Sequence, residues 1–187
     1  SDDLWLPNKL EHQINLIKKN KIDFIHGSYL IINEYDSFIG KFICKTLNYN
    51  QLIKSCDVGT STVMVKSDLI KKHLFKNIST KEDYVCWLSI IKDTKILFGD
   101  NKEVTMYRDR KSSLSGGIVL KFINAFRVYH RYEKKNLIFS ILYTINLSIF
   151  WILKTYKISF INPENVNYKY ISHINNLNFK ESFILSQ

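Results

Sequence analysis

Hydrophobic positions near the start of the chain follow a helical spacing and then an extended one. Leu10 and Ile14 fall on one side of residues 7–20, so that stretch is predicted to be a helix. Residues 23–33 are rich in apolar and β-branched side chains, which favours a strand. Gly27 lies inside this run and predicts an interruption of the strand, because glycine weakens extended structure.

The middle of the chain alternates short extended and helical patterns. Residues 34–55 show no clear periodicity and are predicted to be a loop with a short helix or strand at 38–47. Residues 58–66 are β-branched at their centre and predict a strand. Ser67 is then expected to cap a short helix over residues 68–73.

A longer helical segment begins at the acidic pair Glu82-Asp83. Tyr84 and Leu88 can share one face of that helix. Residues 96–98 and 104–107 follow as two short predicted strands with a turn between them. Helices and strands therefore alternate through this part of the chain, which predicts an α/β layer structure.

The acidic pair Glu82-Asp83 has two interpretations. Ser79 with Glu82 fits the S/T-x-x-E capping box, in which both side chains would satisfy backbone donors at the helix start. Alternatively, the positive end of the helix dipole favours an ionised carboxylate, which suits a residue that accepts a proton. Local sequence favours the cap, and the two interpretations stay open.

The pattern changes after residue 117. Apolar side chains recur at helical spacing from Val119 to Tyr129, while basic residues supply the opposite face: Lys121, Arg127, Arg131, Lys134 and Lys135. Such a helix can lie on anionic lipid or can pack on the preceding part of the chain. Residues 137–153 carry no charge but fall short of the ~20 residues that usually span a bilayer. We expect an interfacial or packed helix there.

Composition limits the class of protein. The 187 residues include 45% hydrophobic side chains, enough for a single domain with a substantial core. Cys44, Cys56 and Cys86 lack C-x-x-C spacing and predict buried or free thiols rather than a zinc site. The net charge of +10 suits an anionic partner, but the lysines are scattered along the chain, which argues against a nucleic-acid-binding protein.

A second acidic pair, Asp2-Asp3, stands at the start and is followed by Trp5 and Pro7. Adjacent carboxylates can hold Mg²⁺ or Mn²⁺, which prefer oxygen ligands and often share them with substrate phosphates. Asp is also common before a helix that has Pro in its first turn.

The two acidic pairs, in this order and with these neighbours, resemble the family 2 glycosyltransferases of the GT-A fold. Residues 1–10 match that family's D-S-D-D-x-W-x-P-x-K-L run except for its first Asp, and Glu82-Asp83 with Trp87 match its Glu-Asp motif. Residues 59–65 are similar to its acceptor-side strand. Tyr107-Arg108 with Ser112-Ser113-Leu114-Ser115 resemble its closing segment.

The resemblance implies roles for single residues. Asp2 would hold a divalent cation, Mn²⁺ or Mg²⁺, with Asp3 beside it, and Asp83 would be the catalytic base. Arg108 and Arg110 are candidate phosphate contacts on chemical grounds, because guanidinium groups match phosphate oxygens. The residues expected to bind substrate or acceptor are Trp5, Thr60, Ser61, Glu82, Trp87 and Arg108.

The resemblance also implies a fold and an activity. The resemblance covers residues 1–117, which would be the acceptor-side, catalytic half of a GT-A nucleotide-diphospho-sugar transferase. The pattern of the following residues, and not the resemblance, predicts a C-terminal helical, membrane-associating region at 118–187. The nucleotide-binding half would precede Ser1, so we expect a fragment whose activity alone is in doubt. The expected reaction is inverting, metal-dependent transfer from a nucleotide-sugar, foremost a UDP-sugar, to a glycan or glycolipid hydroxyl in bacterial surface glycan synthesis.

The expected location is the cytoplasm, with peripheral contact to the inner face of an anionic membrane. The alternatives from other classes are a membrane-surface module based on residues 118–153 and a nucleic-acid-binding domain.

Overall fold

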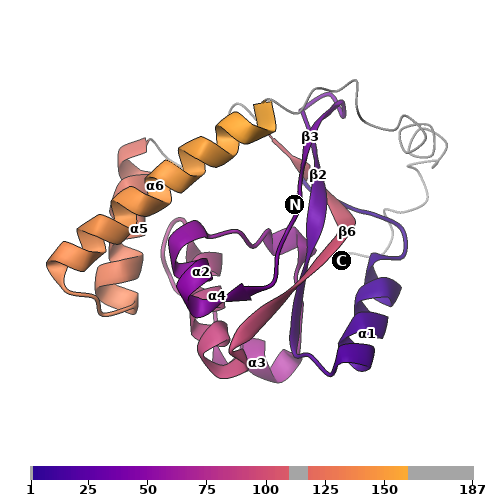
Figure 1. The fold of residues 1–187 in the computed structure, drawn as a ribbon, viewed down its shortest axis with the longest axis horizontal. Coiled ribbons are helices and arrows are strands. Elements are labelled where there is room, and N and C mark those ends of the chain that lie inside the picture. Colours follow the sequence, from indigo (N-terminus) through magenta and orange to yellow (C-terminus); the bar gives the residue numbers. More distant parts are fainter. Residues whose placement is uncertain (1, 110–117, 160–187) are drawn as a thin grey trace.

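The computed structural model describes residues 2–109 and 118–159, which form a mixed six-stranded sheet with helices around it (Figure 1). The elements in chain order are β1 (Leu4–Trp5), α1 (Lys9–Asn20), β2 (Phe24–Ile32), β3 (Phe38–Phe42), β4 (Leu47–Asn48), α2 (Tyr49–Ser55), η1 (Thr60–Thr62), β5 (Met64–Val65), α3 (Ser67–Lys72), α4 (Glu82–Thr94), β6 (Ile96–Arg108), α5 (Ile118–Arg127), η2 (Val128–Tyr132) and α6 (Leu137–Ser159). The predicted α/β class is confirmed.

The sheet is organised around β2 and β6, which run parallel to each other. Strands follow the order β1-β6-β2-β3, while β4 pairs with β6 and β5 pairs with β2. All pairings other than that of β2 with β6 are antiparallel. A parallel pair needs a crossover connection, and here the chain between β2 and β6 supplies it.

The predicted interruption of the strand at Gly27 is wrong, because β2 continues through it. A Cβ atom at Gly27 would lie 2.5 Å from Cγ2 of Val104 on β6. Gly27 therefore allows close approach of the two strands, and the irregularity appears as a register shift between Gly27 and Ser28. The prediction of two strands at 96–98 and 104–107 is also wrong, because both belong to the single strand β6. This strand pairs with β2 on both sides of the register shift.

Two other segments differ from the sequence prediction. Residues 58–66 contain the 3₁₀ turn η1 and the two-residue strand β5 rather than one strand, since the Thr62 N–H bonds to the Gly59 carbonyl. Helix α2 lies in the stretch that showed no clear periodicity. Its start is nevertheless well formed, because Asn48 and Gln51 make a reciprocal capping box.

The capping predictions at Ser67 and at Ser79 are wrong. Ser67 is the first residue of α3, after Lys66. Helix α4 is preceded by Lys81 in a left-handed conformation, and Lys81 makes no side-chain capping bond with any described residue. The Ser79 hydroxyl instead accepts a hydrogen bond from the Asn124 amide on α5.

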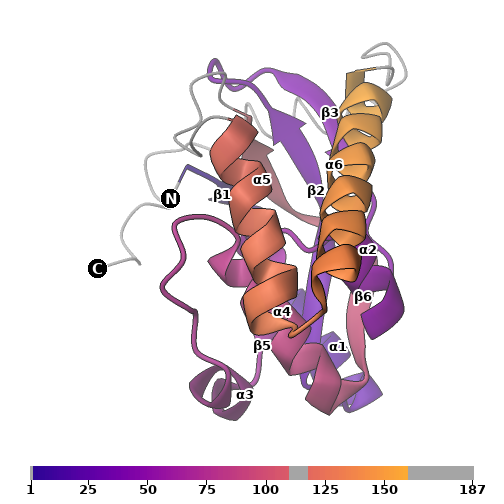
Figure 2. The same ribbon diagram turned by 90° about the vertical axis from the view of Figure 1, so that its left-hand side faces the viewer.

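The helices form layers on the two faces of the sheet. Helix α1 lies on one face, and α2 and α4 lie on the other (Figures 1 and 2). Helix α4 is buried along most of its length and forms the centre of the core. Trp87 packs edge-on against Phe24 of β2, with ring centroids 5.3 Å apart. The three cysteines are free thiols, as predicted.

The elements α5, η2 and α6 form a helical hairpin that packs against α2 and α4 (Figure 2). Tyr129 is fully buried at this contact and donates a hydrogen bond to the Ile53 carbonyl on α2. The Tyr129 hydroxyl also lies 3.2 Å from that of Tyr84 on α4. Among the helices described, including the 23-residue α6, none has the combination of length and apolar character required to cross a bilayer.

His26, buried in β2, generates a prediction about acid stability. Burial lowers the pKa of His26 to about 4, below its ordinary value of 6.5. Between about pH 6.5 and about pH 4 the unfolded chain binds a proton that the folded protein does not, so stability falls as pH falls. The expected loss from this residue is about 3 kcal/mol.

We expect the unfolding free energy of His26→Leu to fall less on acidification than that of the wild type, by the contribution of His26. Urea unfolding of both proteins across that pH range measures it as the difference between the two stability curves, which removes the common contribution of the carboxylates. Parallel curves would contradict a buried, neutral His26.

Candidate functional site

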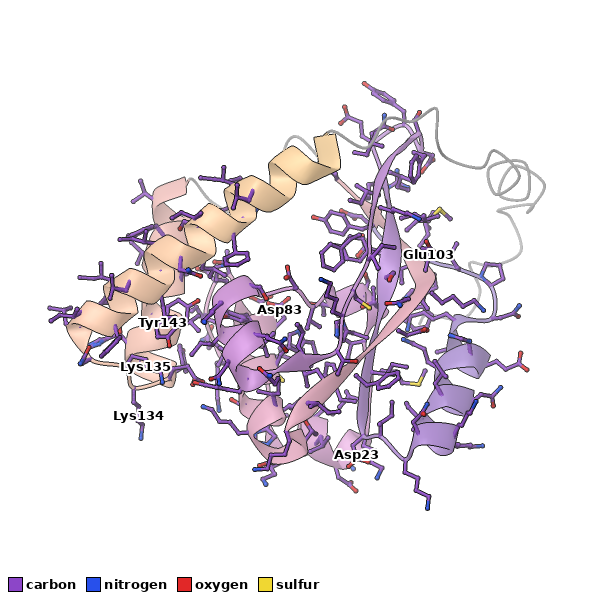
Figure 3. The ribbon with its side chains drawn as sticks, viewed as in Figure 1. Asp23, Asp83, Glu103, Lys134, Lys135 and Tyr143 are labelled. Carbon is purple, nitrogen blue, oxygen red and sulfur yellow. The ribbon has the colours of Figure 1, made fainter. Side chains whose placement is uncertain are left out.

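Asp83 lies in the first turn of α4, near the middle of the molecule between the helices and the central strands (Figure 3). One carboxylate oxygen accepts a hydrogen bond from the Thr60 hydroxyl at 2.5 Å, and the other accepts the Tyr84 backbone N–H at 2.7 Å. The helix dipole favours negative charge at this position. The side chain is only half-buried, so the carboxylate is oriented by two donors and stays accessible.

The turn η1, which carries Thr60, is held in place by a residue of α1, the helix on the sheet face opposite α4. Gln13 of α1 is fully buried and donates from Nε2 to the Thr62 carbonyl at 2.8 Å. Its Oε1 accepts the Lys9 ammonium at 2.7 Å. Lys9 is itself buried, and this burial lowers its pKa to about 8. The N-terminal segment is therefore linked through Gln13 and η1 to the carboxylate of Asp83.

Lys9 and Gln13 were not singled out as functional residues from the sequence. A cation and an amide spaced four apart on a helix often mark a solvated face. The available signal was the position of Lys9 within the W-x-P-x-K run after the acidic pair. Lys9 also lies 4.5 Å from the centre of the Trp5 ring, and Trp5 remains largely exposed on β1.

The acidic pair Asp2-Asp3 is fixed to the end of β6. The Asp3 carboxylate accepts the Arg108 backbone N–H at 3.0 Å, and the Arg108 Nε donates to the Asp2 carbonyl at 3.3 Å. The remaining nitrogens of Arg108 bond the Asn33 carbonyl and the Asp36 carboxylate. The structure therefore places Arg108 as a clamp on the acidic segment, and a phosphate contact would require exchange of these bonds.

A set of aromatic rings lies between the two acidic positions. Tyr29 of β2 stacks on Phe42 at 5.0 Å and lies 5.7 Å from Tyr107, measured between ring centroids. Burial raises the pKa of Tyr107, and the charges of Asp109 and Asp3 add to that effect. On the other side, Gly59 approaches the Tyr29 ring closely, because a Cβ there would lie 3.2 Å from it. A continuous chain of contacts thus runs from Asp3 to the turn that holds Asp83.

The sequence hypothesis required Asp2 and Asp83 to face a common cleft. The structure joins their two segments by the contacts above. Two pockets on the described surface lie elsewhere: one of about 220 Å³ is beside Asn33 and Asp109, and one of about 360 Å³ is beside Ser79 and Arg127. Neither pocket is lined by Asp2 or Asp83, so the shared cleft stays a prediction.

The other predicted site residues occupy different environments. Ser61 lies in η1 beside Thr60 and is half-buried, and Glu82 is exposed at the start of α4. Trp87 is buried, with Phe24 and Phe75 against its ring, so it supports α4 from within the core. Arg110 and the Ser112–Ser115 segment lie outside the described residues.

The carboxylates of Asp2 and Asp3 match the oxygen ligands that Mg²⁺ and Mn²⁺ prefer. Asp2 is exposed, and one oxygen of Asp3 accepts the Arg108 N–H, while its other oxygen accepts no hydrogen bond from any described residue. Within residues 2–109 and 118–159, no group of three or more His, Cys, Asp or Glu side chains could hold a metal. The divalent-cation site at Asp2 and Asp3 therefore stays a prediction.

The chain is similar to bacterial glycosyltransferases. Over 97 residues it is 45% identical to the UDP-Glc:alpha-D-GlcNAc-diphosphoundecaprenol beta-1,3-glucosyltransferase WfgD of Escherichia coli, covering 51% of this chain and 38% of WfgD. It is 31% identical to the Escherichia coli enzyme WfaP, which carries the same activity name, over 62% of this chain and 45% of WfaP.

An uncharacterized glycosyltransferase of Haemophilus influenzae is 31% identical over 78% of this chain and 58% of its own length. The chain thus spans less than two thirds of each of these relatives. No family model matches the chain.

The buried Lys9–Gln13 pair generates a prediction about stability. Gln13→Leu would leave the Lys9 ammonium and the Thr62 carbonyl without their partner and is expected to cost about 3 kcal/mol. Lys9→Met/Gln13→Leu should recover more than half of that loss, because no buried charge remains. Urea unfolding measures both values.

Asn15→Leu, an exposed change on the same helix, serves as the control and is expected to alter stability by less than about 0.5 kcal/mol. Equal losses of unfolding free energy in Gln13→Leu and in Lys9→Met/Gln13→Leu would show that Gln13 does not act by stabilising the charge of Lys9.

Proposed function

We propose that this chain is the acceptor-side part of an inverting, metal-dependent glycosyltransferase with a GT-A fold. The observation that carries the proposal is the Asp83 carboxylate at the start of α4, oriented by Thr60 and tied through Gln13 to the segment that bears Asp2 and Asp3. The similarity to named glycosyltransferases supports the reaction class. The mixed sheet and its helices are consistent with part of that fold.

In the proposed reaction, Asp83 takes the proton of an acceptor hydroxyl as its oxygen attacks the anomeric carbon of the donor sugar. The bond between that carbon and the nucleoside diphosphate breaks on the opposite face, so the configuration inverts. Thr60 keeps one carboxylate oxygen in a fixed direction, which leaves the other lone pairs for the acceptor. A positioned base of this kind contributes about a hundredfold or more to the rate.

Asp2 and Asp3 would hold the divalent cation, Mn²⁺ or Mg²⁺, which when bound neutralises charge on the departing diphosphate. Arg108 keeps these two residues against the end of β6. The proposed donor is a UDP-sugar, and the proposed acceptor is a lipid-linked glycan of a bacterial surface polysaccharide. The names of WfgD and WfaP, which pair UDP-Glc with a diphosphoundecaprenol acceptor, support this choice.

The base assignment is tested by Asp83→Asn in the full-length enzyme. The amide keeps the shape but cannot accept the proton, so turnover should fall by about a hundredfold or more while donor binding stays near normal. Release of UDP in the presence of acceptor measures turnover.

Asp93→Asn is the matched control, because Asp93 is on the same helix but pairs on the surface with Lys72 and His73. The control should retain activity within about twofold. Near-normal turnover of Asp83→Asn would eliminate Asp83 as the base.

We also propose that the α5–α6 hairpin attaches the enzyme to the cytoplasmic face of an anionic membrane. Its outer surface exposes a set of large apolar side chains that few single domains leave uncovered: Val119, Phe122, Ile123, Leu137, Ile138, Phe139, Ile141, Leu142, Ile145, Ile149, Phe150, Trp151, Ile152 and Leu153. Lys134 and Lys135 lie at the connection between the helices (Figure 3). Basic side chains beside an apolar face favour an anionic lipid surface.

Vesicle flotation tests this attachment. Ile138 and Leu142 are exposed one turn apart on α6, and Ile138→Glu/Leu142→Glu should weaken binding to phosphatidylglycerol vesicles by about tenfold or more. Leu10→Glu/Ile14→Glu on α1 makes the same charge change at exposed apolar positions away from the hairpin and should bind like the wild type. Equal weakening by both pairs would argue against the hairpin as the membrane contact.

A further inference from the structure

The pocket of about 360 Å³ lies between the loop that leads into α4 and the junction of α5 with η2. It is lined by Asn77, Ile78, Ser79, Arg127, Arg131 and Tyr132. Most of these side chains offer hydrogen-bond donors, and two carry positive charge. The proposed cation residues and the base do not line it, so its chemistry is separate from the step at Asp83.

Both guanidinium groups in this pocket are available to a ligand. Arg127 and Arg131 are exposed, and neither forms an ion pair with a carboxylate in the described part of the chain. Glu133 is the one acidic residue in the sequence between positions 118 and 159. Its carboxylate is turned away to Lys92 at 2.8 Å and to the Tyr49 hydroxyl at 2.5 Å. Among the described residues, no carboxylate forms an ion pair with either arginine of the pocket.

One wall of the pocket is fixed by a buried amide. Asn124 is fully buried and donates to the hydroxyls of Ser79 and Thr80, both at 2.9 Å. The Asn124 carbonyl oxygen accepts from Arg127 at 3.2 Å. The same side chain thus holds the loop and one guanidinium, so both are positioned before a ligand arrives. Preorganisation of this kind reduces the entropy lost on binding.

The location of the pocket connects a lipid surface with the candidate base. Ser79 precedes Asp83 by four residues, so the two lie at most about 14 Å apart along the chain. In the other direction, Ile123 lies one turn before Arg127 on α5 and is exposed, and Val119 lies one turn before Ile123. The pocket therefore stands between the apolar outer face of the hairpin and the start of α4.

We propose that this pocket binds the diphosphate of the lipid-linked acceptor. Two guanidinium forks and a hydroxyl match the oxygens of a diphosphate, which form strong charge-assisted hydrogen bonds with arginine. The lipid chain would lie along the exposed apolar residues of α5, and the sugar would extend toward Asp83. This assignment rests on the proposed function for its acceptor class, while the pocket itself is defined by Arg127, Arg131 and Asn124.

The test measures binding of inorganic pyrophosphate and of farnesyl diphosphate to the full chain by calorimetry, with EDTA present so that no metal site contributes. Arg127→Gln/Arg131→Gln should weaken both probes by about tenfold or more. Lys121→Gln/Lys134→Gln removes the same charge outside the pocket, at one position on α5 and one in the connection between η2 and α6, and should change affinity by less than about twofold. Circular dichroism establishes that the variants fold.

Three outcomes would overturn the site. The first is equal weakening in the arginine and the lysine variants, which would indicate general electrostatic attraction. The second is unchanged binding in the arginine variant. The third is a metal-free affinity for UDP that depends on the two arginines as strongly as that for farnesyl diphosphate, which would assign the pocket to the donor.

Kinetics of the full-length enzyme separate this inference from the proposed function. The arginine variant should raise KM for a polyprenyl-diphosphate-linked acceptor by about tenfold or more while leaving KM for the UDP-sugar near that of the wild type. Arginine-dependent binding of farnesyl diphosphate in a protein that transfers no sugar would refute the transferase and keep the site. Normal acceptor KM in the arginine variant would refute the site and keep the transferase.

Discussion

The parallel pairing of β2 with β6 is the constraint on which the rest of the structure depends. Two parallel neighbours cannot be joined by a hairpin, so the chain between Ile32 and Ile96 must leave the sheet and return. That connection contains α2, η1, α3 and α4, together with the short strands β3, β4 and β5 that pair with β2 or β6. Helix α4 returns across the face of the sheet, and its burial brings the acidic start of the helix to the central strands. The carboxylate of Asp83 is placed by this topology.

Polar contacts across the sheet then determine how the candidate site is held. The buried Gln13 joins α1 on one face to η1, whose Thr60 reaches the helix on the other side. A buried amide with both ends bonded is stable, whereas one with a missing partner is costly, so this network restricts the position of the turn. At the end of β6, the Arg108 guanidinium bonds the Asp2 carbonyl and the Arg108 backbone N–H bonds the Asp3 carboxylate, so residues 2 and 3 are both fixed.

The hairpin of α5 and α6 has two apolar surfaces with different uses. Tyr129 and Leu147 belong to the inner surface and complete the core around α4. The outer surface is apolar and exposed, and the arginines lie at the junction of the helix with η2. A protein bound to a membrane through that surface would present the pocket proposed for the diphosphate at the headgroup level, where an amphipathic lipid carries its own phosphates.

The sequence by itself determined the longer elements and suggested the chemistry. Periodicity predicted α1, α4 and the two helices of the hairpin, because their buried faces repeat along the chain. The acidic motifs and their neighbours indicated the resemblance to glycosyltransferases, because such motifs are local. The roles of Asp2 and Asp83 remain predictions, since residue type and order do not specify distance.

Tertiary structure alone decided what depends on contacts between distant segments. Gly27 looked like a break and is a point of close approach to Val104, and Ser79 looked like a cap and is a partner of Asn124. The sequence likewise did not reveal the roles of Lys9 and Gln13, because residue type alone does not show whether a polar side chain is buried. These roles depend on contacts between residues far apart in the sequence, and such contacts form only when the chain folds.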